Sequence, residues 1–465
     1  MIKFYNTLTK KKDALKPITP NKVGIFVCGS TVYDSPHLGH ARCCVFYDAL
    51  VKYLKFSGYD VFYLQNITDI DDKIINRAHE KKITPEKLAE NYEKEYLQAM
   101  KVLRVDSVSK YARATEHIKE MISQIQRLFK KDYGYKIEDG IYYDIKKFKG
   151  YGKLSGRTVL QANDAVSRID ETIGKRSRGD FCLWKFSKPK EPSWNSPWGK
   201  GRPGWHIEDT AIAEKYLGLQ YDIHGGGKDL IFPHHEDEIA QMEAISGLSP
   251  MVKYWMHVGF LTVAGSKMSK SLNNFITIND FLKSNSWRLL RLFFLKTHYR
   301  SPVDYTDNNI HQTQKELEKI DDFIARLKNQ AKNGEASKFI ESFVAKSRKD
   351  FYKILDNDMN TPSAMAVIFK LINQGNQIID KDEITFGDAK EIIKFLKEID
   401  SFLCFIFEKE TKVEIPEAVK KIVKEREKAR KNNNWQKSDE LKKEIEKMGY
   451  RVEDTKQKTI VKKNF

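Results

Sequence analysis

Apolar positions near the start of the chain follow two different periods. Residues 23–28 form a short, continuous apolar run rich in β-branched side chains, which is typical of a buried strand. From residue 37 the apolar positions recur at helical spacing until Gly58, and a second apolar run over 61–67 predicts another strand. Strand, helix and strand in succession form a βαβ unit, so we expect a parallel sheet with ligands beyond the carboxyl ends of its strands.

The rest of the chain divides by the kind of pattern that it carries. Residues from about 115 to 200 are rich in turn signals, and we interpret them as an insertion into the α/β domain. Charged helical patterns dominate from Asp307, which predicts a helical bundle. The expected organisation is therefore an α/β domain over 1–306, a helical bundle over 307–410 and a small C-terminal domain over 411–465.

Charge and cysteine content narrow the class of protein. The net charge of +17 and the isoelectric point near 9.3 favour polyanionic partners such as nucleic acid or nucleotides. None of the five cysteines forms a CxxC pair, so reduced thiols are expected. No apolar run is long enough for a membrane span, and the N-terminal segment lacks the apolar core of a secretory signal. We expect a cytoplasmic protein without a membrane partner.

A histidine motif opens the first predicted helix. His37 and His40 are three residues apart and can project from one face of the helix start, where free N–H groups and the helix dipole attract phosphate. Gly39 lets a nucleotide approach the backbone. These residues predict a phosphate site, although an HxxH pattern alone is also found in ordinary helices.

A lysine-rich loop lies over 200 residues further along the chain. In the segment 267–271, KMSKS, Lys267 and Lys270 flank Ser269 and can surround a polyphosphate. The pair of motifs, HLGH and KMSKS, resembles the two signatures of class I aminoacyl-tRNA synthetases. That resemblance implies a Rossmann-type catalytic domain in which the KMSKS loop closes over ATP.

Three residues have the chemistry of metal ligands. His234 and Glu238 are four apart and share a face if this segment is helical, and the thiolate of Cys28 could complete the site at the end of the first strand. The pattern alone is weak, because such pairs are common on helix surfaces. A metalloprotease is a poor fit, since the HEDEI segment lacks the second histidine of HExxH.

Four longer strings resemble the cysteinyl-tRNA synthetase family: FVCGSTVYDSPHLGHAR, NITDIDDKI, PSWNSPWGKGRPGWHIE and DIHGGGKDLIFPHHEDEIAQ. The resemblance implies that Cys28, His234 and Glu238 bind Zn²⁺ together with a second cysteine. At that fourth position this chain has Asp209. A carboxylate can ligate Zn²⁺, so we expect the site to persist, but a different divalent metal or a weaker site becomes plausible.

The same resemblance assigns the substrates. It implies that ATP with Mg²⁺, L-cysteine and tRNA(Cys) bind this chain, which we expect to be a monomer. A metal that bonds the cysteine thiolate would reject serine, so no editing domain is expected. The cysteine and adenylate pocket would be lined by residues of the sheet and its loops: Thr68, Trp205, His224, Gly226 and Asp229.

The C-terminal region has the composition of a nucleic-acid-binding surface. Residues 411–465 carry 17 Lys and Arg against 10 Asp and Glu. By resemblance this is an anticodon-binding domain, and the helical bundle contacts the inner side of the tRNA. Trp435 could stack on a base, and charged residues could contact phosphates or base edges: Arg426, Arg430, Lys437, Asp439 and Asp454.

The expected reaction has two steps, with His37, His40, Lys267 and Lys270 stabilising charge while the cysteine carboxylate attacks the α-phosphate of ATP. The cysteinyl group then passes to a ribose hydroxyl of the terminal adenosine of tRNA.

Two alternative functions stay open. One is a ligase that joins cysteine to a small amine, and the other is a non-catalytic RNA-binding relative.

Overall fold

A computed structural model of the chain describes residues 1–157, 174–268, 272, 274–330, 332–408, 416–432, 434–454 and 459–463. Ser269 and Lys270 of the lysine motif lie outside these residues. Tertiary contacts divide the chain into two compact units, one of residues 1–281 and 285–407 and the other of residues 282–284 and 408–465.

The first unit is built around a parallel sheet of five strands, as the βαβ pattern predicts. Their order across the sheet is β11 (Val252–Val258), β10 (Tyr221–Gly227), β3 (Lys22–Thr31), β4 (Asp60–Thr68) and β5 (Lys110–Arg113). Every neighbouring pair is parallel. The chain leaves β3 towards β4 on one side and returns as β10 on the other, so the strand order reverses there. In open parallel sheets such a reversal creates a ligand crevice at the carboxyl ends of the strands.

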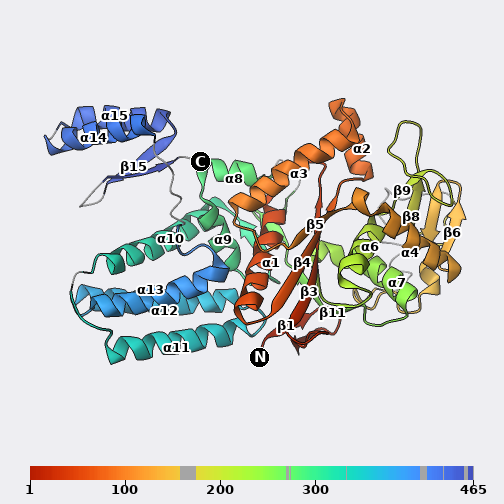
Figure 1. Cartoon of the computed structure of the whole chain (residues 1–465), viewed down its shortest axis with the longest axis horizontal. Helices are drawn as coiled ribbons and strands as arrows, with labels where there is room; N and C mark the ends of the chain where they lie inside the picture. The colour runs from red at the N-terminus through yellow and green to blue at the C-terminus, as the bar shows by residue number, and fades with distance from the viewer. Residues whose placement is uncertain are drawn as a thin grey trace. The chain divides into compact units, whose positions relative to one another are not determined.

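Helices cover both faces of this sheet (Figure 1). Helix α1 (Leu38–Phe56) packs on β4 and β11, whereas α6 (Trp205–Leu217) packs on β3 and β4 and contacts α4 (Ile118–Lys130) and α7 (His234–Ser246). Helices α2 (Asp72–Lys81) and α3 (Pro85–Val102) follow β4 and lead to β5. Helix α3 begins with Thr84 as its N-cap and proline in the first turn, a sequence that stabilises a helix start.

The predicted insertion contains more regular structure than its turn-rich sequence indicates. It includes α4 and an antiparallel sheet of four strands: β6 (Gly134–Ile137), β7 (Gly140–Tyr143), β8 (Phe181–Phe186) and β9 (Gly201–Pro203). Long-range pairing between β7 and β8 joins segments whose local sequences give only weak strand signals. The segment containing α6 then returns the chain to the parallel sheet.

Two small sheets flank this core. The N-terminal hairpin pairs β1 (Lys3–Asn6) with β2 (Lys11–Ala14). A second sheet has the order β13 (Ser266–Lys267), β12 (Leu261–Val263) and β14 (Val303–Tyr305), and it leads into α8 (Ile278–Ser284) and α9 (Trp287–Leu295). Lys267 is therefore presented by a strand.

The helical bundle predicted from Asp307 is present. Its helices are α10 (Asp307–Lys328), α11 (Lys338–Leu355), α12 (Thr361–Asp380) and α13 (Phe386–Leu403). Arg291 of α9 joins the bundle to the α/β core: its Nη2 lies 2.9 Å from Asp48 Oδ2 of α1 in a fully buried ion pair, and its Nε donates to the carbonyl of Leu403 in α13. A buried charge pair is stable only when its remaining polar atoms are also satisfied, so this contact specifies how α1, α9 and α13 meet.

The second unit contains the basic C-terminal region. Two helices, α14 (Glu417–Lys431) and α15 (Trp435–Lys447), precede a hairpin of β15 (Tyr450–Asp454) and β16 (Thr459–Lys463). Its small core includes Val419, Val423, Ile445 and Tyr450. No helix in the described ranges is long and apolar enough to cross a bilayer.

Candidate active site

A bulge in β3 determines where Cys28 lies. The pairing of β3 with β4 is regular as far as Val27 and resumes at Ser30, so residues 28 and 29 are displaced from the ladder. Gly29 donates its N–H to Asn66 Oδ1 at 2.6 Å, and a Cβ at this glycine would overlap the Asn66 carbonyl. Bulges of this kind redirect a side chain beside a site. Strand β3 continues to Thr31, which is longer than its apolar run predicts, because the bulge keeps the later residues paired.

Four predicted metal ligands meet at this bulge. The ligand atoms of Cys28, Asp209, His234 and Glu238 all lie within 4.8 Å of one another. His234 Nε2 is 3.1 Å from Asp209 Oδ2 and 3.0 Å from Glu238 Oε1. The two helical ligands lie one turn apart on α7, as their spacing predicts.

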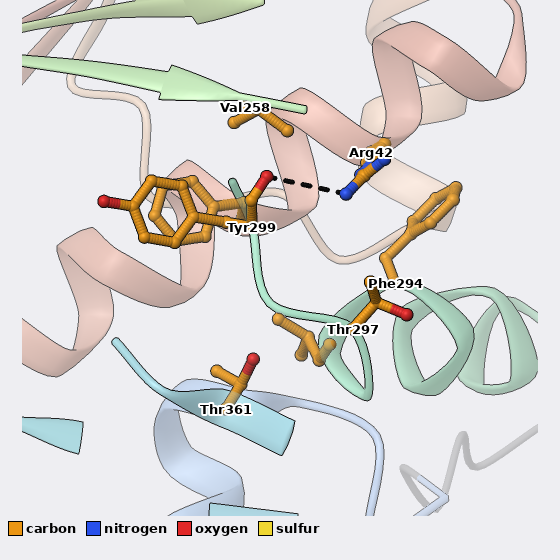
Figure 2. Close-up of a pocket in the computed structure, with 8 residues that line it drawn as sticks. Arg42, Val258, Phe294, Thr297, Tyr299 and Thr361 are labelled. Atoms are coloured by element: carbon orange, nitrogen blue, oxygen red, sulfur yellow. Dashed lines mark hydrogen bonds between the residues drawn. The ribbon is translucent and has the colours of Figure 1, made fainter. Parts of the chain in front are cut away.

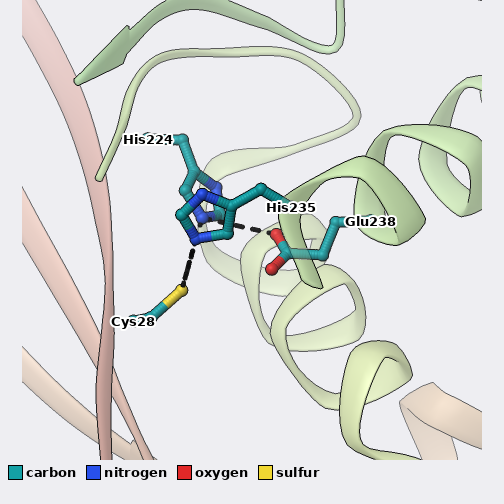
Figure 3. A group of neighbouring side chains, drawn as sticks. All are labelled: Cys28, His224, His235 and Glu238. Atoms are coloured by element: carbon teal, nitrogen blue, oxygen red, sulfur yellow. Dashed lines mark hydrogen bonds and ion pairs between the residues drawn. The ribbon is translucent and has the colours of Figure 1, made fainter. Parts of the chain in front are cut away.

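A second set of potential ligands shares two of these residues (Figure 3). Cys28 and Glu238 also lie close to His224 and His235, and this set likewise falls within 4.8 Å. Cys28 Sγ is 3.1 Å from His235 Nε2, and Glu238 Oε2 is 3.3 Å from His224 Nε2. His224 was expected in the substrate pocket, and His235 was not identified from the sequence.

A chain of hydrogen bonds orients His234. Its Nδ1 lies 2.8 Å from His206 Nδ1, and His206 Nε2 lies 3.3 Å from Asp237 Oδ2. If Asp237 accepts from His206, then His206 Nδ1 must accept from His234, which leaves the lone pair of His234 Nε2 free for a metal. Metal-binding histidines usually have such an outer partner, because it selects the tautomer and holds the ring.

The charges of the site show that a cation fits it. Burial raises the pKa of the Cys28 thiol, and the Asp209 and Glu238 carboxylates raise it further. Burial and the Asp209 carboxylate likewise raise the pKa of Glu238 well above its usual range. Both Glu238 oxygens are fully buried and accept no well-aligned hydrogen bond from the described residues. A buried carboxylate that accepts no well-aligned hydrogen bond and lies beside a thiol and an imidazole is compensated when a cation binds between them.

Two further polar residues, Asn66 and Glu208, lie beside Asp209, and neither was identified from the sequence. Asn66 Nδ2 donates to Asp209 Oδ1 at 2.6 Å and lies 3.1 Å from Glu208 Oε1. The Thr68 hydroxyl also donates to Glu208 Oε1. Burial raises the pKa of Glu208 well above its usual range, and the Asp209 charge adds to this effect. Thr68 thus lies beside Asn66 and Glu208, and its hydroxyl proton is engaged by Glu208.

Aromatic rings enclose the cluster on two sides. The ring of Trp205 stacks on His234 with a centroid distance of 4.0 Å, and 39% of Trp205 is exposed. His224 is fully buried, stacks on Trp255 at 4.4 Å and receives or donates a hydrogen bond at Nδ1 with Tyr221. Trp205 therefore lies at the open side, as a pocket wall requires, whereas His224 lies deeper than expected, directly beside Cys28 and Glu238.

Ring stacking and hydrogen bonds fix the positions and the protonation of the two motif histidines, His37 and His40. Their rings stack with centroids 3.8 Å apart. His37 is the N-cap of α1, its Nδ1 accepts from the Gly39 N–H at 3.1 Å, and His40 Nδ1 accepts from the His37 N–H at 3.3 Å. Burial lowers the pKa of His37 to about 4, and burial together with His37 lowers that of His40 well below its usual range. Both rings are then neutral with the proton on Nε2, so each retains one N–H donor.

The structure brings the segment after the lysine motif beside these histidines. Leu38 donates its N–H to the Ile276 carbonyl at 3.1 Å, Ile278 donates to the Pro36 carbonyl at 2.9 Å, and Phe275 packs edge-on against His37. A Cβ at Gly39 would come within 2.9 Å of the His37 ring, so this packing itself requires a glycine.

Packing within the protein explains the glycines at the end of β10. A Cβ at Gly225 would overlap the hydroxyl of Tyr47, which accepts from the Gly226 N–H at 3.1 Å and donates to the Met256 carbonyl at 2.6 Å. The close approach is thus made by a side chain of α1. Asp229 follows on a short 3-10 helix, Lys228–Ile231, and is exposed.

A separate small pocket lies away from this cluster, around Arg42 (Figure 2). It is lined by residues of α1, α9 and the start of α12, including Phe46, Phe294 and Thr361. The Arg42 guanidinium donates to the carbonyls of Phe260 and Ser301, and burial lowers its pKa to about 10. Because its polar atoms bind backbone, this arginine joins α1 to neighbouring loops, and the pocket contains none of the predicted catalytic residues.

The predicted tRNA-contacting residues differ in accessibility. Trp435 is 56% exposed and carries the Arg430 guanidinium at 5.6 Å from its ring centroid, and Asp439 is also exposed. Arg426 is only 3% exposed, so a direct phosphate contact by this residue does not fit the structure. Lys437 is exposed on α15, and Asp454 ends β15.

Known proteins match this chain over almost its whole length. The family model of the class I (C) tRNA synthetase catalytic domain matches residues 14–315, the DALR domain matches 350–408, and the cysteinyl-tRNA ligase anticodon-binding domain matches 412–461. The chain is 42% identical to the cysteine–tRNA ligase of Thermococcus gammatolerans, covering 99% of both chains, and 43% identical to that of Pyrococcus abyssi with the same coverage.

Solved structures share the fold at low identity. The methionyl-tRNA synthetase of Mycobacterium tuberculosis in complex with methionyl-adenylate matches with a TM-score of 0.61 and 14% identity, over 83% of this chain and 90% of that chain. A leucyl enzyme, described as the LeuRS–tRNA–LeuAMS complex of Agrobacterium radiobacter, matches with a TM-score of 0.59 and 11% identity, over 84% and 85%. At such identities the likeness shows the fold alone.

Proposed function

Because this chain belongs to the cysteinyl-tRNA synthetases, the class I enzymes that load cysteine onto tRNA, we propose that it recognises cysteine through a zinc ion held beside the bulge of β3. The observation that carries the proposal is the convergence of Cys28, His234, Asp209 and Glu238, in which the buried Glu238 carboxylate accepts no well-aligned hydrogen bond from the described residues. The anticodon-binding match at 412–461 favours tRNA over a small amine as the acceptor.

The proposed ligand set contains one sulfur, one nitrogen and two carboxylate oxygens: Cys28, His234, Asp209 and Glu238. When bound, the ion supplies a borderline-soft centre that bonds a thiolate in preference to a hydroxyl. Trp205 closes the exposed side and limits the size of the side chain that enters. Serine, which is nearly the same shape as cysteine, would be rejected by chemistry that a shape-selective pocket cannot provide.

We assign Thr68 and His224 to the floor of the cysteine pocket. The Thr68 hydroxyl donates to Glu208, so its oxygen can still accept a proton from the substrate ammonium group. His224 is held at Nδ1 by Tyr221, and its low pKa keeps it neutral beside Cys28. These contacts orient the carboxylate of cysteine towards the nucleotide.

In the first step the cysteine carboxylate attacks the α-phosphate of ATP, and pyrophosphate leaves. His37 and His40 each present an Nε2–H donor at the start of α1, and we assign these donors to the phosphate oxygens. Lys267 and Lys270 add positive charge as negative charge grows on the leaving group, and ATP carries Mg²⁺. Gly39, Gly226, Asp229 and Ser269 complete the proposed nucleotide site.

In the second step a ribose hydroxyl of the terminal adenosine takes the cysteinyl group and AMP leaves. We propose residues 307–410 and 411–465 as the tRNA-binding domains that follow a catalytic domain over 1–306. Arg430 and Trp435 are the favoured contacts, since both reach the surface of their unit. We further propose a cytoplasmic monomer.

One experiment tests the proposal directly. Zinc is measured in the purified protein, and ATP–pyrophosphate exchange is followed with cysteine and with serine before and after chelation. We expect about one zinc ion per chain and exchange that depends on cysteine and is lost with the metal. A metal-free enzyme that still prefers cysteine would contradict the proposal.

A further inference from the structure

Asp209 poses a coordination problem that a cysteine at the same position would not pose. A thiolate offers one ligand atom, whereas a carboxylate offers two oxygens that can bind one metal together. Four protein ligands leave room for one more group, because Zn²⁺ expands readily from four-coordinate to five-coordinate. If Asp209 bound through both oxygens, the position needed by the substrate thiolate would already be taken.

The two oxygens of Asp209 have different neighbours. Oδ1 accepts a hydrogen bond from Asn66 Nδ2 at 2.6 Å, and Oδ2 lies 3.1 Å from His234 Nε2. Asp209 is 1% exposed and Asn66 is 2% exposed, so this hydrogen bond is buried. Only one oxygen therefore points to the proposed ligand cluster.

The orientation of the Asn66 amide is determined independently. Its oxygen accepts from the Gly29 N–H at 2.6 Å, at the bulge that places Cys28. A backbone N–H can only donate, so the oxygen of the amide must face Gly29 and its NH₂ group must face Asp209. The same side chain thus contacts the backbone beside one proposed ligand and the carboxylate of another.

We propose that Asn66 is a positioning residue that engages Asp209 Oδ1 and so makes Asp209 a single-oxygen ligand, which keeps a coordination position open for the substrate thiolate. This inference rests on the proposed zinc site and concerns the one ligand at which this chain departs from the cysteine of the family pattern. The amide also partly compensates the carboxylate charge without adding a competing cation.

A double-mutant cycle tests the coupling. Asn66→Ala is made alone and together with Asp209→Cys, and cysteine affinity is measured on zinc-loaded protein by calorimetry. We expect Asn66→Ala alone to weaken cysteine binding by about tenfold or more, as outer partners of metal ligands typically do. In the Asp209→Cys background the loss caused by Asn66→Ala should be clearly smaller, because a sulfur has no second ligand atom to restrain and only the effect of the lost Gly29 contact remains. The lost Gly29 contact is common to both backgrounds and cancels in the cycle.

Cobalt substitution gives a readout that a merely structural role would not change. Cobalt-loaded wild-type protein should show the intense visible absorption of a four-coordinate site and lose intensity when cysteine binds. Cobalt-loaded Asn66→Ala should show the weaker five-coordinate spectrum before cysteine is added. Equal losses of cysteine affinity in both backgrounds, or a five-coordinate wild-type spectrum without cysteine, would overturn the inference.

The two proposals fail in different ways. Wild-type protein that takes up neither zinc nor cobalt would contradict the metal site itself. Metal uptake together with equal losses of cysteine affinity in both backgrounds would contradict only the role of Asn66. If Asn66→Ala does not fold, as judged by its thermal unfolding, the wild-type cobalt spectrum decides the question without any variant.

Discussion

The ring of Trp205 lies parallel to that of His234, with 18° between their planes and 4.0 Å between their centroids. Trp205 is the first residue of α6 and His234 is the first residue of α7, so the stack joins the starts of two helices that carry proposed ligands. His206 restrains the same ring at its edge, because His206 Nδ1 lies 2.8 Å from His234 Nδ1. The imidazole is therefore held both by its face and by its outer nitrogen.

Replacing Trp205 should loosen this ring. We expect Trp205→Ala to raise the KM for cysteine and to weaken zinc binding by about threefold to tenfold, since an aromatic pair is worth about 0.5–1.5 kcal/mol beyond its burial. Trp205→Phe keeps a ring on His234 and serves as the matched control. Unaltered zinc affinity and KM in the alanine variant would show that the stack does not support the site.

Asp209→Cys should tighten zinc binding without abolishing activity, because the thiolate is a softer ligand for a borderline-soft ion. Competition with a chromophoric chelator measures the affinity. Asp209→Asn is the control, since it keeps the size of the side chain but removes its charge, and we expect it to weaken binding. Weaker binding in the cysteine variant would indicate that Asp209 selects a harder metal.

His37 predicts a pH dependence of stability. Burial lowers the pKa of His37 to about 4 in the folded protein, whereas the pKa of this side chain in the unfolded chain is about 6.5. Below pH 6.5 the unfolded state binds a proton that the folded state does not, so stability falls as the pH is lowered towards 4. One such group contributes up to about 1.4 kcal/mol per pH unit.

The variant His37→Asn isolates this contribution. Asparagine can still accept from the Gly39 N–H as an N-cap but does not titrate. Urea unfolding of the nucleotide-free protein between pH 7 and 4.5 should show a shallower loss of stability in the variant. Pyrophosphate exchange should also fall, because the Nε2–H donor is gone. Parallel pH profiles would mean that His37 is protonated as easily in the folded protein as in the unfolded chain.

Arg430 and Trp435 should contribute to tRNA binding. We expect Trp435→Ala to cost about 1–3 kcal/mol if the ring stacks on a base, and Arg430→Ala to reduce the salt dependence of binding. Lys420→Ala is a suitable control, because the Lys420 ammonium lies 2.6 Å from Glu417 in an ion pair. Filter binding at several salt concentrations measures both effects, and a salt-insensitive dissociation constant would contradict a phosphate-binding surface.

Removing residues 411–465 should separate the two half-reactions. The proposed catalytic residues lie in the first compact unit and this segment lies in the second, so cysteine-dependent pyrophosphate exchange should persist while tRNA charging is impaired. A full-length variant with Trp435→Ala provides a milder comparison. Unimpaired charging by the shortened chain would show that the C-terminal region is dispensable for tRNA recognition.

Local patterns in the sequence predicted the elements that local forces form. The strand that contains Cys28, the helix from Leu38 to Phe56 and the bundle that begins at Asp307 all follow the expected periods. The sheet of the insertion and the C-terminal hairpin were missed, because their strands are short and are stabilised by partners distant in the chain.

The sequence by itself determined the family, the motif residues and the pair of proposed ligands that one helical turn brings together, since these depend on residue type and local spacing. Only the tertiary structure decided that Asn66 contacts Asp209 across a separation of 143 residues, that His235 lies beside Cys28, and that Arg426 is buried. Such contacts arise where strands and helices pack, and packing depends on the shapes of many side chains at once.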